Sequence, residues 1–151
     1  MQIRYQIPIT NLKQSSNRIY VGAHWSKRKA FKDDVFSYSK AFCRPVQCIT
    51  TYPVSIGYLF LFRKRGFDTT NCTYLVKCVE DSFRALGILK EDNPSCVARS
   101  CIEVVENYST LPPEEIVFLG KKKVEANEDW LIITINPYGR KKKLERDSGK
   151  I

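Results

Sequence analysis

Two adjoining segments decide the fold: VSIGYLFLF at positions 54–62 and NCTYLVKCVEDSFRALG at positions 71–87. In the first, apolar residues on one face alternate with Ser55, Gly57 and two leucines, which predicts a central strand with one strongly apolar and one partly covered face. In the second, Leu75, Val79 and Leu86 fall on one side of a helix together with Ser82/Phe83. Gly87 favours a left-handed stop for that helix.

The flanking sequence supplies further elements. The patterns predict strands at 3–9, 97–106 and 130–136, a short extended piece at 18–21, a helix at 26–42 with Ser26 as N-cap, and a loop or short helix from 112–115. We therefore expect a small α+β domain over residues 1–138, with a mixed sheet packed against two main helices. Residues 139–151 read as a basic flexible tail.

The composition bounds the class of protein. A chain of 151 residues with 43% hydrophobic content and a net charge of +9 suits one core and a polyanionic partner. Its longest apolar run, 54–62, is far shorter than the roughly 20 residues of a membrane helix, and residues 1–5 lack an apolar secretory core. These features predict a protein that stays in the cytoplasm of the cell that makes it.

The cysteines argue against two kinds of chemistry. The six of them include no Cys-x-x-Cys pair, and His24 is the only histidine, so the sequence does not favour a zinc site. We expect buried, reduced thiols. Hydrolysis by a Ser/His or Cys/His pair is poorly supported for the same reason.

Acidic residues gather around the predicted central helix and a lysine. Asp68 precedes the helix, Lys77 and Asp81 lie on its polar face, and Glu91 and Asp92 follow its end. Each has a simpler interpretation, because Asp68 suits a helix cap, Lys77 and Asp81 suit a solvated (i, i+4) pair, and residues 91–94 suit a polar turn.

Taken together, these groups suggest metal and phosphate chemistry. Asp68 and Asp92 flank the helix at the edge that Lys77 and Asp81 face, so four groups can surround one divalent cation. A cation held by carboxylates activates water and stabilises the leaving oxygen of a phosphodiester, and a lysine offsets the developing negative charge.

The spacing Lys-x3-Asp-x5-Gly-x3-acid-Asp from Lys77 to Asp92 resembles that of RusA-like Holliday junction resolvases. Residues 17–20 (NRIY) are similar to the Asn-Arg-aromatic segment of that family, and the expected element order agrees through residue 136. The resemblance implies a small α+β homodimer that cuts branched DNA with magnesium, or with manganese in its place. It implies Asp68, Lys77, Asp81 and Asp92 as catalytic residues, with Glu91 and Asn71 as auxiliary metal ligands.

The chain departs from the family pattern Asp-x-Asp-Asn-x-x-Lys. Without a gap, the two carboxylate positions fall on Asn71 and Thr73; with a short insertion, Asp68 takes one role and a threonine replaces the other acid. Either way one acid is missing, so Asp81 or Glu91 compensates, or the cation is held more weakly.

Basic runs supply a predicted DNA surface. Contacts to the phosphate backbone are expected from 27–29, 63–65 and 140–143, namely Lys27, Arg28, Lys29, Arg63, Lys64, Arg65, Arg140, Lys141, Lys142 and Lys143. The alternative for such runs, including 121–123, is a solubilising surface. Tyr20, His24 and Trp25 either stack on bases or pack against the neighbouring helix.

The sequence therefore predicts a metal-dependent, structure-selective endodeoxyribonuclease that resolves four-way DNA junctions in recombination and repair. The alternative is a non-catalytic DNA-binding accessory protein with a degenerate metal site. A compact resolvase of this kind suits a bacterial cell, encoded by a phage or prophage. We expect it to be a homodimer, with residues 54–62 or 31–42 contributing to the interface.

Overall fold

A computed structural model describes residues 2–12, 25–44, 49, 51–111 and 128–139. The predictions for residues 18–21, 112–115, 121–123 and 140–143 lie outside this part of the chain, as do Tyr20 and His24.

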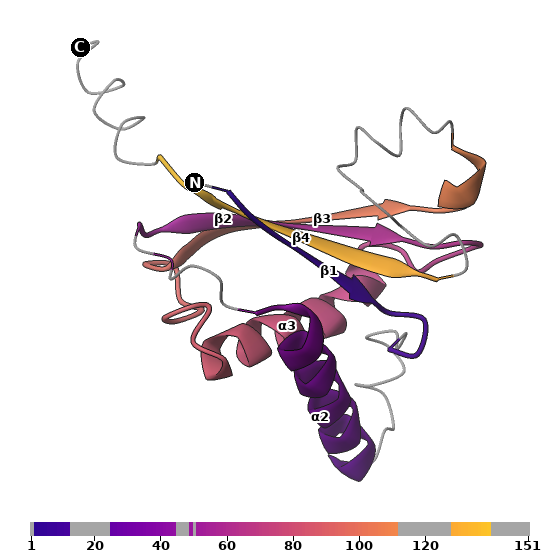
Figure 1. The fold of residues 1–151 in the computed structure, drawn as a ribbon, viewed down its shortest axis with the longest axis horizontal. Helices are drawn as coiled ribbons and strands as arrows, with labels where there is room; N and C mark the ends of the chain where they lie inside the picture. Colours follow the sequence, from indigo (N-terminus) through magenta and orange to yellow (C-terminus); the bar gives the residue numbers. More distant parts are fainter. Residues whose placement is uncertain (1, 13–24, 45–48, 50, 112–127, 140–151) are drawn as a thin grey trace.

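The described residues form one mixed sheet and two main helices (Figure 1). In chain order the elements are β1 (Ile3–Pro8), α2 (Trp25–Phe42), β2 (Val54–Leu61), the 3-10 turn η1 (Thr70–Cys72), α3 (Thr73–Ala85), β3 (Val97–Val105), the 3-10 turn η2 (Tyr108–Thr110) and β4 (Trp130–Pro137). The strand order is β1-β4-β2-β3. β4 is antiparallel to β1 and to β2, whereas β2 and β3 are parallel. The predicted small α+β domain with a mixed sheet is confirmed.

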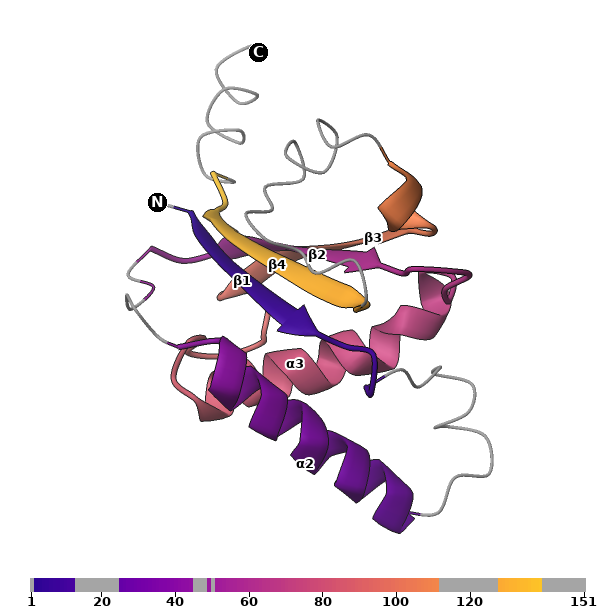
Figure 2. The same ribbon diagram turned by 45° about the vertical axis from the view of Figure 1, so that its right-hand side comes forward.

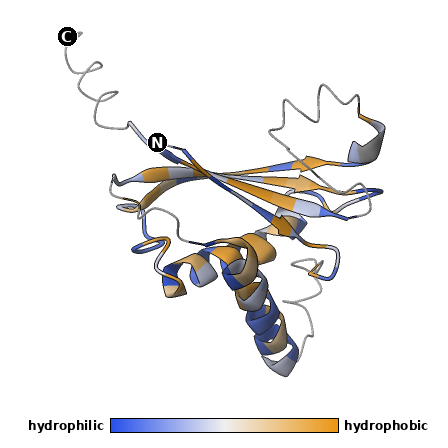
Figure 3. Cartoon of the chain, viewed as in Figure 1, coloured by the Kyte–Doolittle hydropathy of each residue, from blue (hydrophilic) through white to orange (hydrophobic). Residues whose placement is uncertain are grey.

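Both helices lie on the same side of the sheet (Figures 1 and 2). Strand alternation turns Ile56, Tyr58 and Phe60 toward them, and each of these side chains is at most 1% exposed. The edge of the Tyr5 ring packs against Phe83 of α3, with ring centroids 5.6 Å apart. In Figure 3 the strands and α3 carry many residues coloured as hydrophobic.

α3 is positioned by the parallel pairing of β2 and β3. Parallel neighbours need a crossover connection rather than a hairpin, and here α3 is the helix of that connection. One helix face must therefore pack on the sheet, while the opposite face and the loop that leads to β3 stay accessible.

Two predicted helix starts were inexact. α2 begins at Trp25, so Ser26 lies inside its first turn and is not its N-cap. The helix expected from residue 71 begins as the 3-10 turn η1 and becomes α-helical only at Thr73. Cap signals locate a helix end only to within a residue or two.

Of the two segments expected to offer a dimer interface, 54–62 is largely buried, whereas 31–42 is buried only at Phe31, Val35 and Ser39. β2 is paired on both edges, and the alternate residues from Val54 to Phe60 belong to the core. Phe31 is also buried, stacked on Tyr74 with ring centroids 5.5 Å apart. Of the described large hydrophobic residues, those that remain exposed are Trp25, Phe36 and Phe42, all on α2.

Cys43, Cys72, Cys78, Cys96 and Cys101 are free thiols, and all but Cys101 are buried, as expected. Within the described ranges, no helix is long and apolar enough to span a membrane.

Candidate functional site

The end of α3 is built so that the chain turns back along the helix. Gly87 has a φ of 76°, the left-handed conformation expected for a helix stop. The amide of Ile88 donates to the carbonyl of Phe83 at 2.9 Å, and that of Gly87 donates to the carbonyl of Arg84 at 3.2 Å. This pair of bonds is a Schellman motif. Ile88 and Leu89 enter the core behind it.

The reversal brings the acidic loop alongside the polar face of α3. Lys77 Nζ lies 2.8 Å from Asp92 Oδ2 and 3.3 Å from Asp81 Oδ1. Arg84 closes the group, with its guanidinium 3.4 Å from Asp92 Oδ1 and 3.9 Å from a carboxylate oxygen of Glu91. We call these five residues the α3 charge cluster. The structure thus brings together Lys77, Asp81, Glu91 and Asp92, four of the predicted site residues.

The cluster favours the charged forms of its central pair. The hydrogen bond to Lys77 is the main cause that lowers the pKa of Asp92 below its ordinary value. The same bond raises the pKa of Lys77, and the nearby charge of Asp81 adds to this effect. Asp92 is therefore an anion and Lys77 a cation at neutral pH.

Asp68 makes its described side-chain contact at the start of η1. One of its carboxylate oxygens accepts a hydrogen bond of 2.9 Å from the backbone amide of Asn71, at the start of η1. Asp68 thus acts as a local cap at the amino-terminal end of the η1–α3 segment, whereas Asp92 contacts Lys77 and Arg84. The capping interpretation accounts for this contact of Asp68.

The donor chemistry of the cluster suits a hard divalent cation. Asp81, Glu91 and Asp92 offer carboxylate oxygens, the ligands that magnesium prefers. In the arrangement seen, Lys77 and Arg84 pair with these carboxylates, and among the described residues no three His, Cys, Asp or Glu side chains are grouped as metal ligands. A cation would therefore have to displace the contacts of Lys77 and Arg84.

The three residues of the basic run after β2 differ in their surroundings. The Arg63 backbone amide lies 2.8 Å, and its Nε 3.3 Å, from the same carboxylate oxygen of Asp129, which is only 2% exposed. Lys64 and Arg65 are exposed. The sequence did not distinguish Arg63 from its neighbours, because the partner acid lies 66 residues away.

The other described basic run lies on α2. Lys27 and Lys29 are exposed and Arg28 is half-buried. Lys29 lies 3.8 Å from Asp33 on the same helix, an exposed pair of small energetic consequence.

Glu80 is a polar contact that sequence reasoning missed. Its Oε1 accepts hydrogen bonds from the Tyr58 hydroxyl at 2.9 Å and from the Ser100 hydroxyl at 3.1 Å. Burial, reinforced by the charge of Glu80 and by this hydrogen bond, raises the pKa of Tyr58 well above its ordinary value. The signal was present in the strand, since a tyrosine at the centre of an apolar face needs an acceptor for its hydroxyl.

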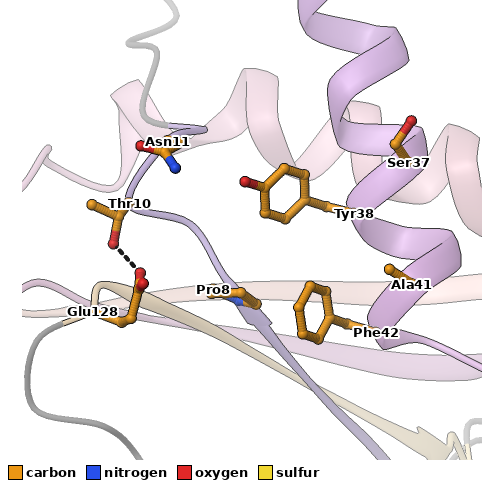
Figure 4. Close-up of a pocket in the computed structure, with 8 residues that line it drawn as sticks. All are labelled: Pro8, Thr10, Asn11, Ser37, Tyr38, Ala41, Phe42 and Glu128. Carbon is orange, nitrogen blue, oxygen red and sulfur yellow. Dashed lines mark hydrogen bonds between the residues drawn. The ribbon is translucent and has the colours of Figure 1, made fainter.

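A separate cavity of about 400 Å³ lies between the end of β1 and the carboxyl-terminal half of α2 (Figure 4). Tyr38 and Phe42 point toward it from α2, and Pro8 faces them from β1. Glu128 is its one charged lining residue among those described, and it accepts a hydrogen bond from the Thr10 hydroxyl. This cavity lacks the paired charges of the α3 cluster and does not suit phosphate chemistry.

No protein-family model matches the chain, and no curated protein matches it either.

Proposed function

We propose that this protein is a metal-dependent endodeoxyribonuclease that resolves four-way DNA junctions, in the manner of the RusA-like family that its sequence resembles. The observation that carries the proposal is the contact of Lys77 with both Asp81 and Asp92 on the accessible face of α3. A lysine between two carboxylates, on the accessible face of the helix that joins two parallel strands, suits phosphodiester hydrolysis.

In this proposal the acids of the cluster hold the metal and Lys77 serves the substrate. Asp81 and Asp92, with Glu91 beside them, are the residues that would bind Mg²⁺ or Mn²⁺. Asn71 would be an auxiliary ligand, and Asp68 would contribute only after its carboxylate leaves the backbone amide of Asn71. The ion, when bound, supplies an activated water and stabilises the leaving oxygen. Lys77 would then turn from Asp92 toward the phosphate and offset its charge. Its side chain is 53% exposed, so it has room to do so.

Exposed basic residues would hold the DNA near the cluster. Lys64 and Arg65 lie on the turn between β2 and η1, in the same chain segment as Asp68. Their role is to bind backbone phosphates, which supplies affinity without sequence preference. Residues 140–143 extend this proposed surface in the sequence.

A second candidate function is a DNA-binding accessory protein with a degenerate metal site. Two observations favour it. The Asp68 carboxylate caps η1, and the carboxylates of Asp81 and Asp92 are paired with Lys77 and Arg84. In this alternative the charges stabilise the α3–β3 loop, and the basic surface alone carries the function.

Cleavage and binding by an Asp92→Asn variant separate the two candidates. The substitution removes a proposed metal-binding charge at nearly constant shape, so junction cutting in Mg²⁺ should fall by roughly 100-fold or more. Junction affinity in a gel-shift assay should stay close to that of the wild type. Glu103→Gln, an exposed acid on β3, is the matched control and should cut normally.

The substrates should include four-way, three-way and linear duplex DNA, with calcium as the non-supporting ion. Preferential magnesium-dependent cutting of the four-way junction, lost in Asp92→Asn, supports the resolvase. Binding without cutting by the wild-type protein supports the accessory role instead. Undiminished cutting by Asp92→Asn would refute the site assignment.

A further inference from the structure

Arg84 is the one member of the α3 charge cluster that sequence reasoning did not single out. It lies seven residues after Lys77 and three after Asp81, so these three side chains share one face of α3. Its guanidinium lies 3.4 Å from Asp92 Oδ1, 3.9 Å from Glu91 Oε2 and 4.0 Å from Asp81 Oδ1. A single guanidinium is thus shared among the three acids of the cluster.

The contacts of Arg84 are looser than the main contact of Lys77. Lys77 Nζ lies 2.8 Å from Asp92, within the roughly 2.7–2.9 Å of a charge-assisted hydrogen bond, whereas each contact of Arg84 is longer. The Arg84 side chain is also 45% exposed, and an exposed pair at such distances contributes little free energy. Arg84 can therefore leave its acids at small cost. Its planar fork of N–H donors matches a phosphate, which can accept two of them at once.

The backbone on either side of the acidic loop is held in place. Ile88 and Leu89 are at most 2% exposed, so they anchor the chain shortly before Glu91. On the other side of the acids, the side chain of Asn93 accepts a hydrogen bond of 3.2 Å from the backbone amide of Ser95. An exchange of ion pairs in the cluster can therefore proceed by rotation of side chains.

The formal charge of the cluster changes sign when a divalent cation binds to it. The three acids and two bases carry a net formal charge of −1, which a divalent cation would change to +1. The cation would also take the carboxylates with which Arg84 pairs, and would leave its guanidinium close to another positive charge. A phosphate of the DNA backbone is an anion that restores the balance.

We propose that Arg84 exchanges its acidic partners for a backbone phosphate of DNA when a divalent cation occupies Asp81, Glu91 and Asp92, so that metal and DNA bind cooperatively. Arg84 competes with the cation in the free protein and binds the substrate in the complex. The inference rests on the proposed function and deepens it by adding a substrate contact. Because linkage is reciprocal, DNA should raise the metal affinity by the same factor as metal raises the DNA affinity.

A simpler role for Arg84 is to stabilise the end of the helix. It lies in the last turn of α3, where a basic side chain interacts favourably with the helix dipole. That role predicts that Arg84→Met lowers stability and leaves the metal affinity unchanged. The exchange predicts tighter metal binding instead, because the substitution removes a competing cation.

Calorimetric titration of the DNA-free protein with Mn²⁺ measures this competition. Arg84→Met keeps the apolar part of the side chain and removes its charge, so it should bind Mn²⁺ about 5-fold more tightly than the wild type. Arg84→Lys keeps the charge and should stay closer to the wild type. Lys90→Met is the matched control, because Lys90 is an exposed cation next to Glu91 in the sequence but is not part of the cluster. It should bind Mn²⁺ as the wild type does.

Junction affinity measured by anisotropy in EDTA and in Ca²⁺, at equal ionic strength, tests the contact with DNA. In the wild type, Ca²⁺ should raise the affinity for a four-way junction roughly 5- to 150-fold, the typical range for coupled sites. Arg84→Met should lose much of this increase, and Lys90→Met should keep it. A phosphate that binds the metal alone would leave the increase intact in Arg84→Met.

Wild-type Mn²⁺ affinity in Arg84→Met, or an undiminished effect of Ca²⁺ on its junction affinity, would overturn the exchange. The proposed nuclease would survive that result if the wild type cuts the junction and Asp92→Asn does not. Mn²⁺ binding that persists in Asp92→Asn would place the ion outside the cluster, and failure of the wild type and of both Arg84 variants to bind Mn²⁺ would remove the metal site. Either result would overturn the exchange as well. Cooperative binding without cutting would support the exchange and count against the nuclease.

Discussion

The guanidinium of Arg63 lies against a carboxylate that the fold has removed from solvent. Asp129 is 2% exposed, and one of its oxygens accepts hydrogen bonds from both the backbone amide and Nε of Arg63. Removing one partner of such a contact leaves a buried charge poorly satisfied. Arg63 is therefore a structural residue within a run whose other members are exposed.

Arg63→Ala should lower the free energy of unfolding by about 1–2 kcal/mol, less than for a fully buried pair because the Arg63 side chain is 36% exposed. Lys64→Ala combined with Arg65→Ala is the matched variant and should leave stability unchanged. It should instead reduce the slope of log affinity for DNA against log salt by about two. Urea denaturation measures the stability of both variants, and salt titration measures their DNA binding. A loss of stability in the Lys64/Arg65 double variant, with none in Arg63→Ala, would show that Arg63 is not the structural residue of this run.

The buried thiols predict a sensitivity to alkaline pH. Burial raises the pKa of the Cys43 thiol from its ordinary value of 9.0 to about 12. A raised folded pKa means that the native state holds the proton more tightly, so the associated stability is complete below about pH 9 and is lost as pH rises toward 12. Cys72 and Cys78 follow the same rule, with pKa values of about 12 and about 11.

Cys43→Ala should therefore show a smaller loss of stability than the wild type between about pH 8 and about pH 11, by at most about 1.4 kcal/mol per pH unit. Urea midpoints across this range measure the effect. Cys101→Ala, at a partly exposed position, is the control. Parallel alkaline losses in the wild type and Cys43→Ala would show that the thiol stays neutral in both states.

At the scale of elements, α3 carries one set of contacts on each face. Its inner face packs on the sheet, and Glu80 joins it to β2 through Tyr58 and to β3 through Ser100. Its outer face carries Lys77, which meets the loop that the Schellman motif turns back. The same helix thus ties the parallel strands together and presents the charge cluster.

Tyr58→Phe should cost about 1–3 kcal/mol of stability, because it removes a buried hydrogen bond to a charged acceptor. The hydroxyl of Tyr38 faces the open cavity beside α2, so Tyr38→Phe is the matched control and should change stability little. Thermal or urea unfolding of both variants provides the comparison. An equal effect of the two substitutions would mean that the contact with Glu80 adds no stability.

Periodicity was sufficient to predict these elements, because the apolar positions of β2 and α3 follow the spacing of a strand and of a helix. Gly87 marked the helix end, and the polar face placed Lys77 beside Asp81. The sequence offered the cap by Asp68 as one of two interpretations without deciding between them, and it did not reveal that Arg84 joins the cluster. The cap depends on the local backbone geometry before η1, and the contacts of Arg84 depend on the path of the loop after Gly87; spacing along a helix determines neither.

For the whole molecule, the sheet order decides which surfaces remain for a partner. β4 and β2 are interior strands, so the apolar stretch at 54–62 is used within one copy of the chain. The remaining exposed aromatic surface lies on α2, where Phe42 is 47% exposed beside the cavity lined by Tyr38. Of the two expected interface segments, 31–42 therefore keeps exposed aromatic surface for a partner, at Phe36 and Phe42.

The proposed resolvase should be a homodimer. Resolution of a four-way junction requires incision of two symmetry-related strands, and the described chain provides one α3 charge cluster. A twofold axis relating two copies would place a cluster at each strand, matching the symmetry of the substrate. Light scattering of the purified protein should therefore give twice the mass of the chain, and Phe42→Lys should shift the equilibrium toward monomer because it puts a charge into an apolar contact.

Asp33→Lys is the control for this substitution, since residue 33 lies nine positions before Phe42 and so on the opposite side of α2. It introduces the same side chain and should leave the dimer intact. A dimer that persists in Phe42→Lys would place the interface elsewhere on the fold. A wild-type protein that is monomeric both free and bound to junction DNA would contradict paired incision, because one cluster can cut only one strand at a time.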